Sequence, residues 1–174
     1  MRIITLAAIM LCLSSVCQAE PTTFKDWFVD AGDGFVYAAT INSSGSTLGQ
    51  YCYNKDDTCY YLIGFDIKCT KDNKYPVLVN SDAGALYIEP ICDAPIEASG
   101  NYRYFIKFDE IDKVIKTGSV IGFAFPMQGD QFKAFRFSLD GAKDSITFMR
   151  RLVGEAIDRK KGTPEKGDLK NSTF

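Results

Sequence analysis

The stretch GQYCYNKDDTCYYLIGFDIKC, residues 49–69, decides how this chain folds. It contains three cysteines and four tyrosines around the polar segment YNKDDT. From Cys59 to Cys69, large apolar side chains recur at every second position, which is the period of a β-strand. The pattern predicts a strand over residues 58–68, with one face formed by Cys59, Tyr61, Ile63, Phe65, Ile67 and Cys69 and the other by Tyr60, Leu62, Gly64, Asp66 and Lys68.

The chemistry of these cysteines depends on the compartment, which the N-terminus indicates. Arg2 is followed by an apolar run over residues 3–13, and Cys17 and Ala19 place small side chains before a cleavage point. This order predicts a signal peptide over residues 1–19, cleaved after Ala19. The run is too short to span a bilayer, and no later segment is long and apolar enough to do so. We therefore expect a periplasmic or secreted protein with no membrane span.

Cleavage removes Cys12 and Cys17 and leaves four cysteines: Cys52, Cys59, Cys69 and Cys92. An even number of cysteines in an exported chain indicates disulfide bonds. A zinc site is disfavoured, because its cysteines usually lie two to four residues apart and the sequence has no histidine. A thiol oxidoreductase is disfavoured by the absence of a Cys-x-x-Cys motif.

The predicted strand also narrows the disulfide pairing. If it is continuous, Cys59 and Cys69 lie about 33 Å apart at about 3.3 Å per residue. The Cα atoms of a disulfide lie within about 7 Å, so a Cys59–Cys69 bond is excluded, and Cys52–Cys92 with it. Two pairings remain, and locality favours Cys52–Cys59 with Cys69–Cys92. The polar residues 53–58 have the composition of a turn that would bring Cys52 opposite Cys59.

The rest of the chain predicts one domain, over residues 20–157. Short β-branched or aromatic runs alternate with turn residues, and they predict strands at 25–30, 34–41, 47–53, 58–68, 75–79, 84–91, 102–108, 118–125 and 132–139. A short helix is predicted over Asp109–Lys116, ending at Gly118. A second, amphipathic helix begins after Asp140, which we expect to cap it; its apolar positions are Ala142, Ile146, Met149, Val153 and Ile157. Residues 158–174 are polar and predict a disordered tail.

These elements predict a mainly β fold: an antiparallel β-sandwich with one short helix and a C-terminal amphipathic helix, stapled by disulfides. After cleavage the chain has 155 residues, with 19 basic residues (20 without Arg2) against 22 acidic ones, a net charge of −3. Nucleic-acid binding is disfavoured, because it requires a basic face.

Two short motifs carry a family resemblance. Phe24, Asp26 and Trp27 match an aromatic-x-Asp-Trp opening, and Ser138, Leu139 and Gly141 match a Ser-Leu-x-Gly turn that leads into a helix. With them, residues 24–153 resemble the invasion-associated locus B family of exported bacterial proteins. The family usually has a cysteine directly after its first strand, where this chain has Ala31-Gly32-Asp33. The resemblance implies a compact, disulfide-bonded β-sandwich of the bacterial envelope with no known catalytic residues.

The residues themselves point to no catalytic, cofactor or metal site. Without histidine, the chain lacks the usual general base and the Ser-His-Asp and Cys-His arrangements. Asp30–Gly34 lacks the alternating ligands of a calcium loop. Paired carboxylates at Asp56 and Asp57, or at Asp109, Glu110 and Asp112, leave one enzymatic alternative open, a histidine-free hydrolase of the cell envelope.

The tyrosines suggest a binding surface instead. The chain has nine, and tyrosines on both faces of neighbouring strands cannot all lie in the core. Tyr53 and Tyr60 are the candidate residues of an exposed aromatic patch suited to a protein or glycan partner; the competing interpretation places the tyrosines under the helix or the second sheet. We therefore expect a non-enzymatic protein that binds an envelope or host partner, or inhibits a foreign hydrolase, without a cofactor.

Overall fold

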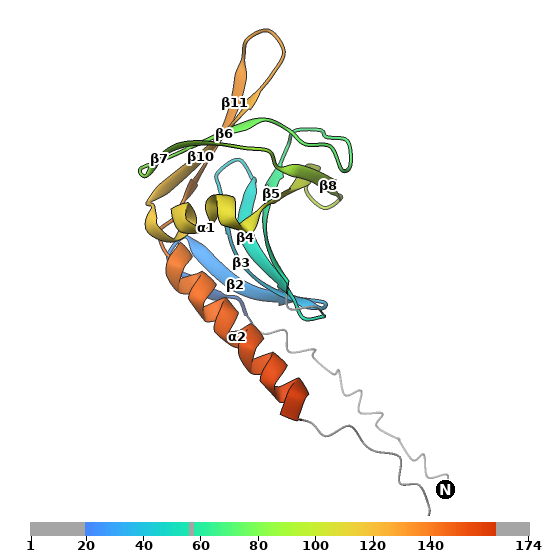
Figure 1. The fold of residues 1–174 in the computed structure, drawn as a ribbon, viewed down its shortest axis with the longest axis vertical. Coiled ribbons are helices and arrows are strands. Elements are labelled where there is room, and N and C mark those ends of the chain that lie inside the picture. Colours follow the sequence, from blue (N-terminus) through green and yellow to red (C-terminus); the bar gives the residue numbers. More distant parts are fainter. Residues whose placement is uncertain (1–19, 56–57, 163–174) are drawn as a thin grey trace, which may run out of the picture.

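The computed structural model describes residues 20–55 and 58–162, with side chains up to Asp158. The signal peptide predicted at 1–19 and residues 163–174 of the predicted tail lie outside the described residues. The described chain is mainly β, with two antiparallel sheets, two helices and two disulfides (Figure 1). The fold class predicted from the sequence is confirmed.

The larger sheet has seven strands, and the first five follow one another in the chain as a meander. In spatial order they are β1 (Thr22–Phe24), β2 (Trp27–Gly32), β3 (Phe35–Ile41), β4 (Thr47–Tyr53), β5 (Cys59–Phe65), β9 (Asn101–Ile106) and β8 (Ile91–Ile96). The smaller sheet has four strands, in the order β11 (Phe132–Ser138), β10 (Val120–Pro126), β6 (Val77–Ser81) and β7 (Gly84–Ile88). The helices are α1 (Phe108–Thr117) and α2 (Ala142–Gly162).

The inner faces of the two sheets meet around one aromatic ring. Phe65, at the end of β5, is fully buried. Its ring lies between 4.1 and 6.1 Å, centroid to centroid, from the rings of Phe123, Phe125, Phe135 and Phe137 on β10 and β11. Every one of these rings sits at an alternate position of its strand, so the period of two places them all on the side that faces the other sheet.

Helix α2 covers the part of the larger sheet that the smaller sheet does not reach, over β1 to β3 (Figure 1). Its predicted apolar stripe faces the core, because Ala142, Ile146, Met149 and Val153 are all buried and Ile157 is partly buried. Helix α1 packs between α2 and β5, and buries Ile111 and Ile115.

A polar cluster joins the two helices to the sheet. Asp112 on α1 accepts hydrogen bonds from the Tyr61 hydroxyl (2.8 Å), from Lys116 Nζ (2.8 Å) and from Arg150 Nη2 on α2 (3.0 Å). Arg150 also donates through Nε to Gln50 on β4 (2.7 Å). Burial raises the pKa of Asp112, but the hydrogen bonds from Lys116 and Tyr61 and the charges of Lys116 and Arg150 outweigh it and lower that pKa below its ordinary value.

The two motifs that carry the family resemblance lie side by side, although more than a hundred residues separate them. The indole Nε1 of Trp27 donates to the carbonyl of Ser138 (2.9 Å), and the amide of Asp26 donates to the carbonyl of Asp140 (3.2 Å). Gly141 has φ +93°, and a Cβ atom there would collide with the backbone carbonyl of Phe24. The glycine is therefore required by close backbone approach as well as by its left-handed conformation.

Most predicted strands are shifted by one or two residues at their ends, and three of them differ from the structure in a way that changes its interpretation. Strand 58–68 is too long, because β5 ends at Phe65 and the chain leaves the sheet there. The predicted strand 25–30 begins too early, because Lys25 and Asp26 form the turn between β1 and β2, with φ +53° at Lys25, and β2 begins only at Trp27. Strand 84–91 is divided at Glu89-Pro90 into β7 and β8, which belong to different sheets, because proline cannot donate a ladder hydrogen bond.

The predicted disulfides are both present, Cys52–Cys59 and Cys69–Cys92. Cys52 and Cys59 are direct cross-strand partners on β4 and β5, with Cα atoms 4.0 Å apart, as the turn argument predicted. The second argument was wrong in its premise, because the strand that should have separated Cys59 from Cys69 ends at Phe65. The pairing that it favoured is nevertheless the observed one.

The C-terminal helix differs from the prediction at both ends. The Asp140 carboxylate does not cap it; it accepts a hydrogen bond from Lys25 Nζ (2.6 Å), and the Gly141 carbonyl accepts the first helical bond, from the amide of Ser145 (3.0 Å). Residues 158–162, predicted to be disordered tail, continue α2 to Gly162. Neither helix in the described chain is long and apolar enough to cross a membrane.

Candidate functional site

The outer face of the larger sheet carries aromatic side chains where a sandwich usually presents polar ones. We call this surface the aromatic face; its rings come from five strands and are Phe28, Phe35, Tyr37, Tyr51, Tyr53, Tyr60 and Phe105. Six are half-buried and Tyr60 is 39% exposed. Both helices and the smaller sheet pack on the inner face, so no described element covers this one.

Strand register brings these rings together. Tyr37 lies opposite Tyr51, Tyr51 opposite Tyr60, and Phe35 opposite Tyr53. The rings of Tyr37 and Tyr51 are stacked, 5.0 Å apart and within 5° of parallel, and Tyr60 connects Tyr53 (6.2 Å) to Phe105 (5.4 Å). Such cross-strand aromatic pairs stabilise a sheet, so the rings are held in fixed positions before any partner arrives.

Three adjoining hollows follow the aromatic face. The largest, about 700 Å³, lies between Tyr53, Tyr60 and Phe105 on the sheet and Phe108 at the start of α1. A second of about 170 Å³ shares Tyr53 with it, and a third of about 330 Å³ shares Phe35, Thr47 and Tyr51 with the second. Small residues on neighbouring strands, among them Ala39 and Gly64, form the floor of the two smaller hollows.

Charged side chains border this surface, among them Lys107 and Asp109 at the largest hollow, and some of the others are paired. The Tyr37 hydroxyl donates to Asp30 (3.2 Å), and Arg103 forms an ion pair with Asp93 at the β8 border. Burial, followed by the neighbouring Tyr37, raises the pKa of Tyr51 to about 12. The phenol of Tyr51 is therefore neutral at ordinary pH, and the surface offers apolar rings with hydroxyl groups rather than charge.

The sequence identified part of this surface. Tyr53 and Tyr60, the two predicted patch residues, both line the largest hollow, and their rings are in contact. That they bind a partner remains a prediction. The competing interpretation holds for Tyr61 and Tyr104, which are fully buried on the inner face.

The sequence did not identify the other five rings of the aromatic face as part of the patch: Phe28, Phe35, Tyr37, Tyr51 and Phe105. Alternation along their strands could have assigned them to a shared face, but only strand pairing shows that the faces adjoin.

The acidic residues considered for catalysis do not form a common site in the described chain. Asp112 is engaged by Lys116, Arg150 and Tyr61, and Asp109 lies at the rim of the largest hollow. Glu110 has a buried carboxylate oxygen, Oε2, without a hydrogen-bond partner. Asp56 and Asp57 lie outside the described residues. Among residues 20–55 and 58–162, no three His, Cys, Asp or Glu side chains are grouped so as to hold a metal ion.

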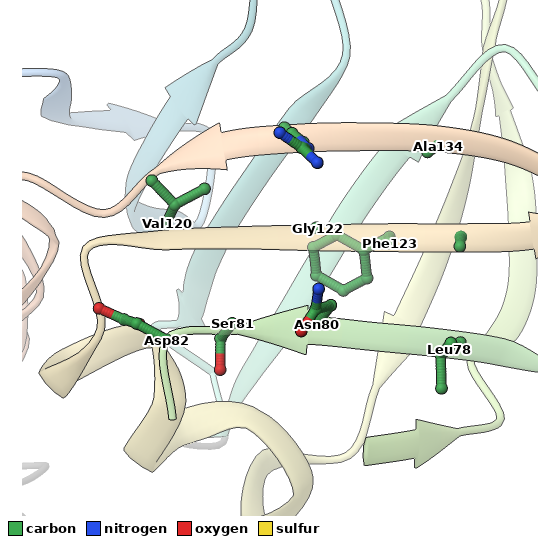
Figure 2. Close-up of a pocket in the computed structure, with 10 residues that line it drawn as sticks. Leu78, Asn80, Ser81, Asp82, Val120, Gly122, Phe123 and Ala134 are labelled. Atoms are coloured by element: carbon green, nitrogen blue, oxygen red, sulfur yellow. The ribbon is translucent and has the colours of Figure 1, made fainter. Parts of the chain in front are cut away.

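A separate hollow lies on the outer face of the four-stranded sheet. Figure 2 shows Leu78 and Asn80 on β6 beside Gly122 on β10 and Ala134 on β11. The hollow has a volume of about 360 Å³ and a floor of small side chains. Arg136 is the only charged side chain on its β11 side, and its guanidinium makes no hydrogen bond or ion pair with a described residue.

Comparison with known proteins identifies a solved structure with a similar fold. No family model matches the sequence. No curated protein matches it either. The structure resembles invasion associated protein B. The crystal structure of that protein from Bartonella henselae superimposes with a TM-score of 0.51 over 82% of this chain and 99% of the other, at 15% sequence identity.

The similarity to invasion associated protein B confirms, at the level of the fold, the resemblance that the two terminal motifs suggested. At 15% identity it shows a shared fold and nothing about partner or activity. Function must therefore be argued from the surfaces of this chain, of which the aromatic face is the most extensive.

Proposed function

We propose that this chain is an exported, non-enzymatic β-sandwich protein that binds an envelope or host protein through its aromatic face. The observation that carries the proposal is the uncovered row of seven rings with its three adjoining hollows. Large apolar surfaces on soluble proteins usually mark interaction sites, and tyrosine is enriched where binding energy is concentrated. The two disulfides and the fold shared with invasion associated protein B support export.

The arrangement of the rings favours a protein partner over a glycan. Sugars bind by lying flat on exposed ring faces, but Tyr37 and Tyr51 already cover one face of each other, and Tyr60 meets Phe105 edge-on, with 63° between the ring planes. These contacts reduce the ring surface on which a sugar could lie, whereas the apolar hollows remain open. Such hollows accept apolar side chains from a partner surface, and the tyrosine hydroxyls can donate hydrogen bonds at its rim.

The experiment compares capture of partners by matched variants. The chain without residues 1–19 is immobilised, and envelope or host extracts are cross-linked to it. Tyr60→Ala combined with Phe105→Ala removes both rings from the largest hollow, and we expect the captured partner to be lost at least tenfold. Leu78→Ala, which removes an exposed side chain from the other sheet (50% exposed), is the control and should keep it.

Equal capture by the double variant and the wild type would refute the aromatic face as the binding site. Soluble oligosaccharide serves as a competitor. If it releases the captured partner, the ligand is a glycan rather than a protein surface. Thermal melting of each variant shows whether the loss of binding occurs in a folded protein.

A further inference from the structure

The edges of the two sheets differ in how they are protected. An edge strand exposes unpaired backbone N–H and C=O groups, and soluble proteins usually shield or shorten such strands. The two sheets have four edge strands: β1 and β8 in the larger sheet, and β11 and β7 in the smaller one. Three of them carry an identifiable protective device within the described chain.

Strand β1 is only three residues long and follows Pro21. Strand β8 contains Pro95 and a bulge between Cys92 and Ala94, and the loop between β5 and β6 covers its edge. In that loop, the carbonyl of Asn73 accepts a hydrogen bond from the Cys92 amide (2.9 Å), and the amide of Asp72 donates to the Cys92 carbonyl (2.8 Å).

Strand β11 is shielded by side chains from the other sheet. Asn42 Nδ2 donates to the carbonyl of Arg136 (3.2 Å), and Trp27 Nε1 donates to that of Ser138 (2.9 Å). Lys133 and Arg136 add charge along the same strand, a common means of preventing edge-to-edge association.

Strand β7 has none of these devices. Its sequence, Gly84-Ala85-Leu86-Tyr87-Ile88, contains no charge, no proline and no bulge. Tyr87 is 61% exposed, and its cross-strand partner Leu78 is 50% exposed. Only β6 pairs with it. No hydrogen bond from another described element reaches the backbone N–H or C=O groups of Ala85 or Tyr87.

The turn before β7 determines which of its backbone groups are free. Ser81 pairs with Gly84 across a two-residue turn, so this closing pair is hydrogen-bonded and the bonded pairs alternate from there. Leu86 and Ile88 therefore use their N–H and C=O groups with β6. Those of Ala85 and Tyr87 point away from the sheet.

We propose that β7 pairs antiparallel with β7 of a second copy of this chain, joining two four-stranded sheets into one of eight strands. The two-fold axis passes between the two Leu86 residues, so Ala85 of each copy faces Tyr87 of the other. Each of these two pairs exchanges both backbone hydrogen bonds, because Ala85 and Tyr87 carry the outward-pointing groups.

A second copy fits this edge better than an unrelated strand for two reasons. The register sets the largest side chain of β7 against one of its smallest, Tyr87 against Ala85, on the exposed face at both crossings. The strand carries no charge, so no like charges meet on the axis within it. Closed two-fold pairing also uses up both free edges, whereas pairing with another strand would leave a new edge exposed.

The first test measures mass and amide exchange on the chain without residues 1–19. Light scattering after gel filtration should give twice the mass of one chain, falling towards one chain on dilution. By NMR, the amides of Ala85 and Tyr87 should become protected from hydrogen exchange as the concentration rises. The amide of Leu86, which is bonded within the monomer, should show the same protection throughout.

The second test uses variants. Ala85→Pro removes an outward-pointing N–H that the monomer does not use, and Tyr87→Lys places a charge on the edge; both should leave only single chains. Ala134→Lys adds the same charge to the same sheet on β11, and should still form the pair. Because a proline variant can fail to fold, Tyr87→Lys decides the matter if Ala85→Pro does not show the wild-type circular dichroism spectrum.

The proposal is overturned if the wild type remains a single chain up to about 1 mM. It is also overturned if a pair forms without concentration-dependent protection of Ala85 and Tyr87, or if it persists in Tyr87→Lys. None of these outcomes bears on the aromatic face, which lies on the other sheet, so the two proposals stand or fall separately.

Discussion

At the scale of single residues, Phe65 holds the two sheets together. It is the last residue of β5, and its ring contacts four phenylalanines from β10 and β11 as well as Tyr104 beside it. No other ring contacts as many aromatic neighbours in the described chain. The chain leaves the larger sheet directly after this residue, so the ring lies at the end of β5, where the larger sheet contacts β10 and β11.

Replacing Phe65 with alanine should cost about 3–5 kcal/mol in the free energy of unfolding, because the cavity would lie between two sheets that cannot both move inward. Tyr60→Ala removes a larger side chain from the same strand but from the exposed face, and it should cost less than about 1.5 kcal/mol. Urea titrations of both variants measure the difference. Equal losses would mean that the inner faces do not meet at Phe65.

Asp112 gives stability a dependence on pH. Its pKa in the folded protein is lowered, so its ion pairs stabilise the fold above the ordinary carboxyl pKa and the contribution is lost as the pH falls through the lowered value. Asp112→Asn keeps the shape but not the charge. We expect it to lower the melting temperature at about pH 7 and to differ progressively less from the wild type towards about pH 2. A difference that does not change with pH would show that the charge is not the stabilising feature.

At the scale of elements, the C-terminal helix covers the part of the larger sheet that the smaller sheet leaves open. The smaller sheet packs on β5 and β9, and α2 packs on β1 to β4, so that together they cover the inner face of the first six strands in the spatial order of the larger sheet. Its contact is specific as well as apolar, because Arg150 reaches across to Gln50 and Asp112.

Met149→Ala should therefore destabilise the protein by about 2–4 kcal/mol, since the Met149 side chain is fully buried on the core-facing side of α2. Lys143→Ala, on the exposed side of the first turn of the same helix, is the control and should stay within about 0.5 kcal/mol of the wild type. Thermal melts of the two variants provide the measurement. If both change the melting temperature equally, α2 is not docked as described.

At the scale of the whole molecule, the two disulfides act on different lengths of chain. Cys52–Cys59 closes a hairpin of adjacent strands, with a sequence separation of 7, whereas Cys69–Cys92 spans 23 residues that include β6 and β7. The second bond thus closes a loop that contains two strands of the smaller sheet, and it joins the start of that loop to β8 at the edge of the larger sheet.

Removing each bond by a double Cys→Ala substitution should cost about 2.5 kcal/mol for Cys52–Cys59 and about 3.5 kcal/mol for Cys69–Cys92, because a longer loop gains more entropy when it is released. Chemical denaturation measures both values. Titration of the chain without residues 1–19, under denaturant and without reductant, should find no free thiol. A reversed order of the two losses would show that strain or residual structure, rather than loop length, sets the contribution of each bond.

Export gives a separate prediction, on residues outside the described chain. Mass spectrometry of protein from its native host should find an N-terminus at Glu20 and no lipid on the chain. A lipid-modified Cys17 would contradict it. The measurement is independent of the fold.

How far the sequence predicted this molecule depends on whether a feature is local. The alternation of Tyr61 and Ile63 with Tyr60 and Leu62 predicted the two faces of β5, because side-chain period is a property of one strand. The end of β5 was missed because the alternation continues through Ile67 and Cys69, which still contact the core after the backbone has left the sheet.

Features that depend on strand pairing could not be predicted in this way. Tyr37 and Tyr51 face each other only because β3 pairs with β4 in one register, and a shift of one residue would separate their faces. The aromatic face therefore emerged from the sequence as two tyrosines and from the structure as seven rings. Likewise, the contact of Trp27 with Ser138 was visible only as two short motifs far apart in the chain.

The strand order of the larger sheet also implies an order of events during folding. Strands β1 to β4 each pair with the next strand in the chain, so the loops between them are short and close at little entropic cost. Pairing of β9 with β5 must wait until residues 66–100 have been arranged, and α2 comes later still in the chain. If the chain is exported as we propose, and emerges from a translocation channel N-terminus first, it would form its meander, and the Cys52–Cys59 hairpin within it, before the residues that cover the inner face are available. During that interval the ring of Phe65 and the other inner-face side chains would be open to solvent, and it is then that the protein would most need the help of a chaperone.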